Sequence, residues 1–201
     1  MLTKLFVATA ALLALMPAAG TSAGVVPTSG EGCPDQTFAQ AFAQFGDRRL
    51  YTAVPNGSFE NGTAGWQITG DAAVVPHVNP FRPNPGTGAL LMGPGSVATS
   101  PPVCVTRHYP SARTFLQKVS GGLLSRVGVE VLYPARRIGW PIARKPAGFL
   151  GGSPLFGPSR RFSIAQGLFG RGPVEIRIRL TARGAGTFLI DDLLVDPRCR
   201  S

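Results

Sequence analysis

The chain has 201 residues, a formal net charge of +10 and three cysteines. Length alone predicts one domain with enough chain to bury a real core. After the first 23 residues, no segment is apolar for long enough to span a membrane, which excludes a helical integral membrane protein.

Residues 1–23 have the three parts of a secretory signal. Lys4 supplies a short positive region, Leu5–Met16 is an apolar run, and Thr21–Ala23 supplies small residues for cleavage. A run of about twelve apolar residues is too short to span a bilayer core of roughly 30 Å. No cysteine directly follows the run, so a lipid anchor is not expected. The sequence therefore predicts a mature chain, from about Gly24, that is secreted.

The positive charge comes almost entirely from arginine, since only three of the twenty basic residues are lysines. Removing Lys4 with the signal changes the net charge from +10 to +9. One interpretation is codon usage in a GC-rich bacterial genome, which also favours alanine, glycine and proline. The other is attraction to anionic polymers such as teichoic acids or lipid headgroups. Nucleic acid is not an expected partner.

An odd number of cysteines in an oxidising compartment allows one disulfide and a spare thiol, an intermolecular bond or a free thiol. Cys33 and Cys104 flank the early part of the fold and are the preferred pair. Closing a loop of about seventy residues would stabilise the fold by a few kcal/mol. Cys199 lies in the short tail 198–201, and its role is left open. The spacing is not that of a zinc site.

The N-terminal part of the mature chain, 24–53, is expected to be a leader followed by a capping segment. Between Pro34 and Gly46, apolar residues recur at helical spacing, namely Phe38, Ala41, Phe42 and Phe45. This pattern predicts a short amphipathic helix or a compact turn that caps one end of the fold. The intervening polar residues are not basic, which argues against a membrane-binding helix.

From residue 54 to 197 the pattern is one of short strands and turns. In Val174–Leu180 apolar and charged residues alternate strictly, and Val127–Tyr133 does the same around Glu130. Such alternation predicts strands with one buried and one solvated face, and hence an all-β antiparallel sandwich or jelly roll. The other expected strands are Ser58–Glu60, Trp66–Thr69, Ala72–Val75, Ala89–Met92, Val103–Arg107, Thr114–Val119 and Thr187–Val195.

Two segments interrupt this regularity. Pro76–Gly88 contains four prolines, and Pro134–Pro158 is rich in proline, glycine and arginine. A loop as long as the second is usually functional or disordered. Trp140, next to Arg136 and Arg137 in that loop, is either a stacking surface for a ligand or an apolar peg that tethers the loop.

No catalytic motif is present. The chain lacks a G-x-S-x-G elbow, a P-loop, a G-x-G-x-x-G loop and an H-E-x-x-H pair. His77 and His108 have no ligand set near them in sequence, and no acid pair can be assembled from the spacing of the carboxylates. We therefore do not expect an enzyme.

One set of carboxylates calls for an explanation. Asp191 and Asp192 interrupt an apolar run, and neighbouring strand residues point to opposite faces, so at least one of them should be buried. A buried carboxylate requires a cation, an arginine or several amide donors. Calcium, which takes carboxylate and carbonyl oxygens, is one solution, and pairing with arginine or the backbone is the other.

Two motifs resemble those of the galactose-binding-like jelly rolls, which include several families of carbohydrate-binding modules. The first is Asn56–Glu60 followed by Gly65–Trp66, and the second is Ile190–Asp192 about 135 residues later. The resemblance covers about 54–197 and implies that Trp66 is a packing residue. In such families the opening glutamate and the first aspartate of the closing strand often hold a structural calcium ion, here Glu60 and Asp191.

The Cys33 region and Ser100–Val105 also resemble a group of secreted bacterial proteins built on this sandwich. The resemblance implies a secreted, non-catalytic module that binds a glycan or another cell-surface polymer. The alternative is a basic structural or interaction protein of the cell envelope that binds anionic polymers. The candidate ligand-binding residues are Trp140, Tyr109, Tyr133, Arg136 and Arg137.

Overall fold

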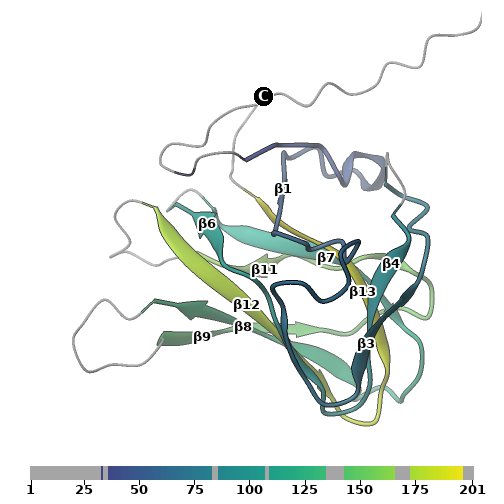
Figure 1. Ribbon diagram of the computed structural model, residues 1–201. Helices are drawn as coiled ribbons and strands as arrows, with labels where there is room; N and C mark the ends of the chain where they lie inside the picture. The colour runs from purple at the N-terminus through teal and green to yellow at the C-terminus, as the bar shows by residue number, and fades with distance from the viewer. Residues whose placement is uncertain are drawn as a thin grey trace, which may run out of the picture.

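In a computed structural model of the chain, the described residues are residue 33 and residues 36–82, 86–106, 109–134, 143–165 and 173–196. They form two antiparallel sheets that pack face to face (Figure 1). This confirms the predicted all-β sandwich. No helix in the described part of the chain is long and apolar enough to cross a membrane.

The larger sheet has the strand order β10-β7-β13-β4-β3, with β1 on β13 and β11 on β7. Its strands are β1 (Thr52–Ala53), β3 (Ala72–Pro76), β4 (Gly88–Met92), β7 (Ser111–Lys118), β10 (Gly157–Pro158), β11 (Phe162–Ser163) and β13 (Phe188–Asp196). The smaller sheet has the order β2-β5-β12-β8-β9, with β6 on β12. Its strands are β2 (Gln67–Thr69), β5 (Val97–Thr99), β6 (Val103–Val105), β8 (Arg126–Tyr133), β9 (Ala143–Leu150) and β12 (Val174–Arg183).

The core between the sheets is built by the alternation seen in the sequence. On β12, Ile176, Ile178 and Leu180 are fully buried, and their neighbours in sequence remain partly or fully exposed. Val127 and Val131 of β8 enter the same core. Burying each such side chain stabilises the fold by roughly 1.5–3 kcal/mol. The period of two therefore determines which face of the smaller sheet packs in the core and which face remains accessible to solvent or a ligand.

The expected strand Ser58–Glu60 is wrong, because this stretch is a series of turns. Asn56 and Phe59 have positive φ angles of 48° and 58°, which no strand permits. The Asn56 side chain donates to the carbonyls of Gly62 and Ala64 at 3.0 Å and so holds the turns. Phe59 is 1% exposed and packs on Trp66, which is buried as expected of a packing residue.

The expected loop Pro134–Pro158 is also wrong in part, because strand β9 occupies Ala143–Leu150 and pairs with β8. Pro146 and Gly148 make this strand hard to predict from the sequence, since both residues are rare in strand interiors. The strand tolerates them because it lies at the edge of the sheet and because the register shifts between Val129 and Glu130. Residues 135–142 lie outside the described part.

The N-terminal segment packs on the face of β7 that points away from the main core. It contains a 3-10 helix, Ala43–Phe45, in place of a longer helix. Phe42 is fully buried and stacks on Phe115 of β7, with ring centroids 5.0 Å apart. A disulfide between Cys33 and Cys104 also holds this segment, as predicted. This part of the segment is thus a compact turn with one short 3-10 helix, packed on an outer sheet face.

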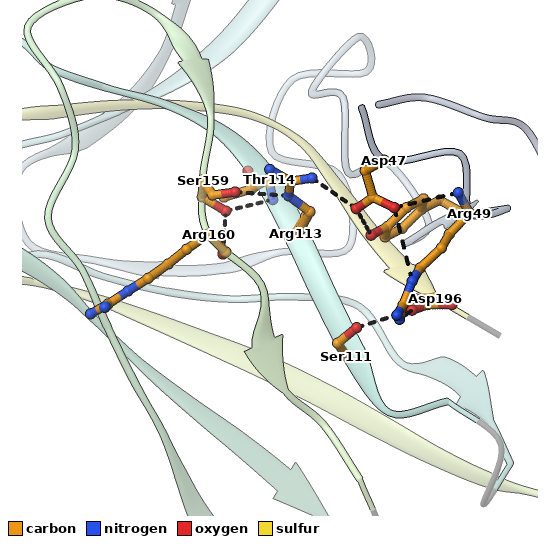
Figure 2. Close-up of polar contacts among 9 residues, drawn as sticks. Asp47, Arg49, Ser111, Arg113, Thr114, Ser159, Arg160 and Asp196 are labelled. Atoms are coloured by element: carbon orange, nitrogen blue, oxygen red, sulfur yellow. Dashed lines mark hydrogen bonds and ion pairs between the residues drawn. The ribbon is translucent and has the colours of Figure 1, made fainter. Parts of the chain in front are cut away.

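Two ion pairs fasten this segment to the sandwich (Figure 2). Asp47 accepts hydrogen bonds from Arg113 at 2.9 Å and from the Tyr51 hydroxyl at 2.8 Å. Arg49 pairs with Asp196 at 2.9 Å, and Asp196 also accepts from Ser111 at 3.1 Å. The segment then continues into β1, which extends the larger sheet by pairing with β13.

Candidate functional site

The two adjacent aspartates lie at an irregularity in β13. The register with β7 shifts between Asp191 and Leu194, and Asp192 has a φ of 50°. Both carboxyl groups are buried, with 1% and 7% of each residue exposed. Asp191 Oδ1 accepts a hydrogen bond from the Asp192 backbone N–H at 2.7 Å. Asp191 Oδ2 is buried and has no hydrogen-bond partner among the described residues.

Arg82 links these aspartates to Glu60. Its Nε lies 3.2 Å from Asp192 Oδ1, and its Nη1 lies 3.4 Å from Glu60 Oε1. Asn79 Nδ2 donates to Asp192 Oδ2 at 2.7 Å, and the Thr87 backbone N–H donates to Glu60 Oε2 at 2.9 Å. Arginine and amide pairing, one of the two solutions left open by the sequence, therefore satisfies Asp192 and Glu60.

The donor set does not fit a hard cation that needs six to eight oxygen ligands. A guanidinium contacts both Glu60 and Asp192, and no group of three or more His, Cys, Asp or Glu side chains in the described residues is disposed to hold a metal. Glu60 is exposed, and its two carboxylate oxygens already contact Arg82 and the Thr87 N–H. Calcium binding by Glu60 and Asp191 stays a prediction.

Burial governs the ionisation of this cluster. It raises the pKa of Asp191 to about 8, and the neighbouring Asp192 carboxylate adds to the shift. Burial also raises the pKa of Asp192, to about 6, although Arg82 and Asn79 oppose that change. Asp191 is thus largely protonated at neutral pH, which lowers the cost of leaving Oδ2 without a partner.

We expect Arg82→Gln to lower the stability by about 2–4 kcal/mol, because it leaves the buried Asp192 without its cation. Thermal and urea unfolding at pH 7 measure the loss. The matched control is Arg160→Gln, since Arg160 is exposed and donates only to the Phe149 carbonyl among its described contacts. Equal stability of both variants would show that Arg82 contributes no more than a surface residue.

A second candidate site is the outer face of the smaller sheet. The strand register aligns one residue from each strand in a row across this face, Gln67, Thr99, Arg179, Glu130 and Pro146. These residues alternate with core residues, so their side chains point away from the core. Thr99 is 3% exposed and Pro146 is apolar, so the polar surface of this row comes from Gln67, Arg179 and Glu130.

Arginine dominates this face. Its five arginines come from three adjacent strands and are opposed by two carboxylates, Glu130 and Glu175; they are Arg126, Arg144, Arg177, Arg179 and Arg183. Arg179 lies 4.0 Å from Glu130, and the Arg177 guanidinium donates to the Ser100 carbonyl at 3.0 Å. The face therefore has a surplus of positive charge, held on a rigid sheet.

An aromatic ring lies among these cations. Phe149 of β9 is 38% exposed. The guanidinium carbon of Arg126 is 3.9 Å from its ring centroid, and that of Arg183 is 5.8 Å away. Cation–π contacts of this kind stabilise the arginines over the ring. The result is a partly exposed apolar surface bordered by hydrogen-bond donors.

Comparison with known proteins bears on the fold. No protein-family model matches the chain, and no curated protein matches it. The CBM22-1 xylan-binding domain of Paenibacillus barcinonensis Xyn10C has a TM-score of 0.47 and 15% identity, covering 69% of this chain and 90% of that one. The CBM22-2 xylan-binding domain of the same protein has a TM-score of 0.49 and 12% identity, covering 69% and 96%. A family 16 carbohydrate-binding module has a TM-score of 0.45 and 15% identity, covering 71% and 98%.

The chain is structurally similar to carbohydrate-binding modules. At these identities the likeness concerns the fold alone.

The ligand-binding residues expected from the sequence are not on that surface where the structure describes them. Tyr109 is wrong as a stacking residue, because it is 2% exposed and its hydroxyl donates to Gln36. Tyr133 packs against the core and donates to the Ile164 carbonyl at 3.0 Å, so it too is a packing residue. Trp140, Arg136 and Arg137 lie outside the described residues.

Sequence reasoning predicted the solvated face of β12 but did not single out its arginines. The signal was available, because Arg177, Arg179 and Arg183 are spaced by multiples of two. Their position on one face with Phe149 and Arg144 depends on the pairing of β9 with β8, which the local sequence does not encode. Only strand pairing brings these residues together.

Proposed function

We propose that this protein is a secreted, non-catalytic module that binds an anionic cell-surface polysaccharide on the outer face of the smaller sheet. The observation that carries the proposal is the set of five arginines facing two carboxylates across β8, β9 and β12. The proposal combines the two functions expected from the sequence, a glycan-binding module and a basic protein that binds anionic polymers.

The geometry of the face suits an extended ligand. Guanidinium groups bind carboxylate and phosphate groups in a bidentate manner, which makes arginine more selective than lysine for such groups. Gln67 and Glu130 in the row across β2, β5, β12, β8 and β9 add polar groups that can bind sugar hydroxyls. Phe149 offers an apolar surface against which a sugar ring can pack.

Two observations support the remaining parts of the proposal. The disulfide between Cys33 and Cys104 is consistent with folding in an oxidising compartment outside the cytoplasm. On the proposed face, Glu130 is paired with Arg179 instead of with a second carboxylate, so it does not form the acid pair of a glycosidase.

The test compares an acidic and a neutral polymer. We expect polygalacturonate to retard the protein in affinity electrophoresis, and neutral xylan to do so much less. Arg177→Gln with Arg179→Gln should weaken polygalacturonate binding by about tenfold or more, and binding should fall steeply with salt. Arg48→Gln with Arg161→Gln is the control for losing two positive charges elsewhere, because both arginines are exposed and lie outside this face. Binding that is unaffected by salt, or equal for the two polymers, would contradict the proposal.

A further inference from the structure

Exposed apolar side chains gather at one end of the sandwich. Seven large hydrophobic residues are exposed in the described part of the chain, and five of them lie at or near the turn that joins β7 to β8. Within the turn itself, Leu123 is 99% exposed, Leu124 is 85% exposed and Val119 is 53% exposed. Phe149 and Leu155 are the other two. Scattered single residues need no explanation, but such a cluster does.

The base of this turn is held firmly. The Val119 N–H donates to the Thr187 carbonyl at 2.9 Å, and the Ser125 N–H donates to the Gly122 carbonyl at 3.1 Å. Ser125 is 4% exposed and packs against the next turn, since a Cβ on Gly186 would lie 2.5 Å from the Ser125 Cβ. The two leucines therefore project from an anchored turn.

Basic residues flank the turn that carries the two leucines. Lys118 precedes the turn, and its ammonium donates to the Gly122 carbonyl at 3.3 Å. Arg126 follows the turn and lies opposite Arg183 in the register of β8 and β12. Asp71 is the acidic residue at this end, next to Gly93. The end thus combines an apolar tip with a positively charged rim.

The apolar surface continues beside the tip. A cavity of about 500 Å³ lies between β7 and the segment that follows β9, and its lining includes Leu116, Leu150 and Phe156. The segment is tied to β7, because the Lys118 N–H donates to the Ser153 carbonyl at 2.7 Å. Leu155, which is 76% exposed, lies at the edge of this cavity.

We propose that this end of the sandwich docks on a membrane surface that carries anionic lipids, with Leu123 and Leu124 inserted among the acyl chains. Exposed apolar residues beside basic ones bind such surfaces by burial and by attraction to the headgroups together. A stable protein interface buries about 800 Å² on each partner, which two leucines at the apex of a turn do not supply. The inference goes beyond the polymer-binding function: the rim shares Arg126, Arg183 and Phe149 with the polymer face, but Leu123 and Leu124 at the apex are not part of that face.

Vesicle co-sedimentation tests this proposal. The protein is the processed chain recovered from the medium of a secreting host, and the vesicles are phosphatidylcholine with or without phosphatidylglycerol. We expect binding to the anionic vesicles. Leu123→Ser with Leu124→Ser should reduce that binding by at least about tenfold, because the energy of burying two leucines is lost. The melting temperature should not change, since both side chains are exposed.

Two further measurements make the result specific. Leu123→Trp should show blue-shifted emission on anionic vesicles and quenching by brominated lipids, which reports insertion. Val78→Ser is the matched control, because Val78 is 60% exposed but lies outside the cluster. Equal sedimentation of wild type and the double leucine variant would overturn the proposal. So would a lipid-free dimer that the double variant abolishes, because the tip would then bind a second copy of the chain.

The polymer-binding proposal and the membrane-docking proposal can be contradicted independently of each other. The double leucine variant should still bind polygalacturonate, and the Arg177→Gln, Arg179→Gln variant should still insert the Leu123→Trp reporter. Loss of both activities in the leucine variant, with its melting temperature unchanged, would mean that the tip belongs to the polymer site and would overturn the lipid proposal.

Discussion

Asp191→Asn is expected to raise the melting temperature at pH 8 and to change it little near pH 4. The pKa of Asp191 rises from 3.8 to about 8 on folding, because of burial and then repulsion by Asp192. A carboxyl group with a raised pKa contributes its full stability below the unfolded value, and that stability is lost as the pH rises toward the folded value. Each pH unit in this window costs about 1.4 kcal/mol for an isolated group, so the gain at pH 8 is a few kcal/mol.

Asparagine keeps an oxygen to accept the Asp192 N–H and removes the charge. Thermal unfolding of both proteins from pH 4 to 9 measures the effect, and the slope of stability with pH should be smaller in the variant. Glu130→Gln is the control, because Glu130 is a partly exposed carboxylate on the other sheet. A wild-type protein whose stability increases from pH 5 to 8 as steeply as that of the variant would contradict this account.

The same variant separates arginine pairing from the calcium prediction. If calcium binds Glu60 and Asp191, a chelator should lower the melting temperature of the wild type and excess Ca²⁺ should restore it. Asp191→Asn and Glu60→Gln would then both destabilise the protein at pH 8. If Arg82 supplies the positive charge, chelator and Ca²⁺ should leave melting unchanged, and only Glu60→Gln should cause a loss. The sign of the Asp191→Asn effect distinguishes the two.

Cys33→Ser is expected to lower the stability by about 4 kcal/mol, the largest loss for a single substitution here. The disulfide joins residues 71 positions apart, and cross-linking a loop of this length restricts the unfolded chain strongly. It also holds the start of the segment that packs Phe42 against Phe115 of β7. Urea unfolding of the oxidised wild type and the variant measures the difference.

Cys199→Ser is the matched control and should not change stability, because the other two cysteines are bonded to each other. Reduction of the wild type should reproduce the Cys33→Ser loss. A reduced protein as stable as the oxidised one would show that the ion pairs of Asp47 and Arg49 hold the N-terminal segment without the disulfide.

Several strands could be predicted because their information is local. Val174–Leu180 alternates in a period of two, and both its buried and its solvated residues are where that period puts them. Ser58–Glu60 and β9 failed for the opposite reason. In the first segment, the positive φ angles and the hydrogen bonds of the Asn56 side chain hold turns in place of a strand. In β9, the position at the sheet edge tolerates a proline and a glycine. Both features depend on the surrounding structure, which overrides local propensity.

For the candidate sites too, some features follow from the local sequence and others only from the tertiary structure. The sequence alone established that Asp191 and Asp192 needed a partner, because an apolar run cannot leave two adjacent carboxylates solvated. It also predicted the sandwich, because strand alternation is a local pattern, and it favoured Cys33–Cys104 among the open possibilities, which the structure then showed as a disulfide. Only the tertiary structure decided that Arg82 contacts both Glu60 and Asp192, and that the arginines of three strands share a face with Phe149. These contacts join residues far apart in the chain, so they depend on strand order and register, which no local pattern encodes.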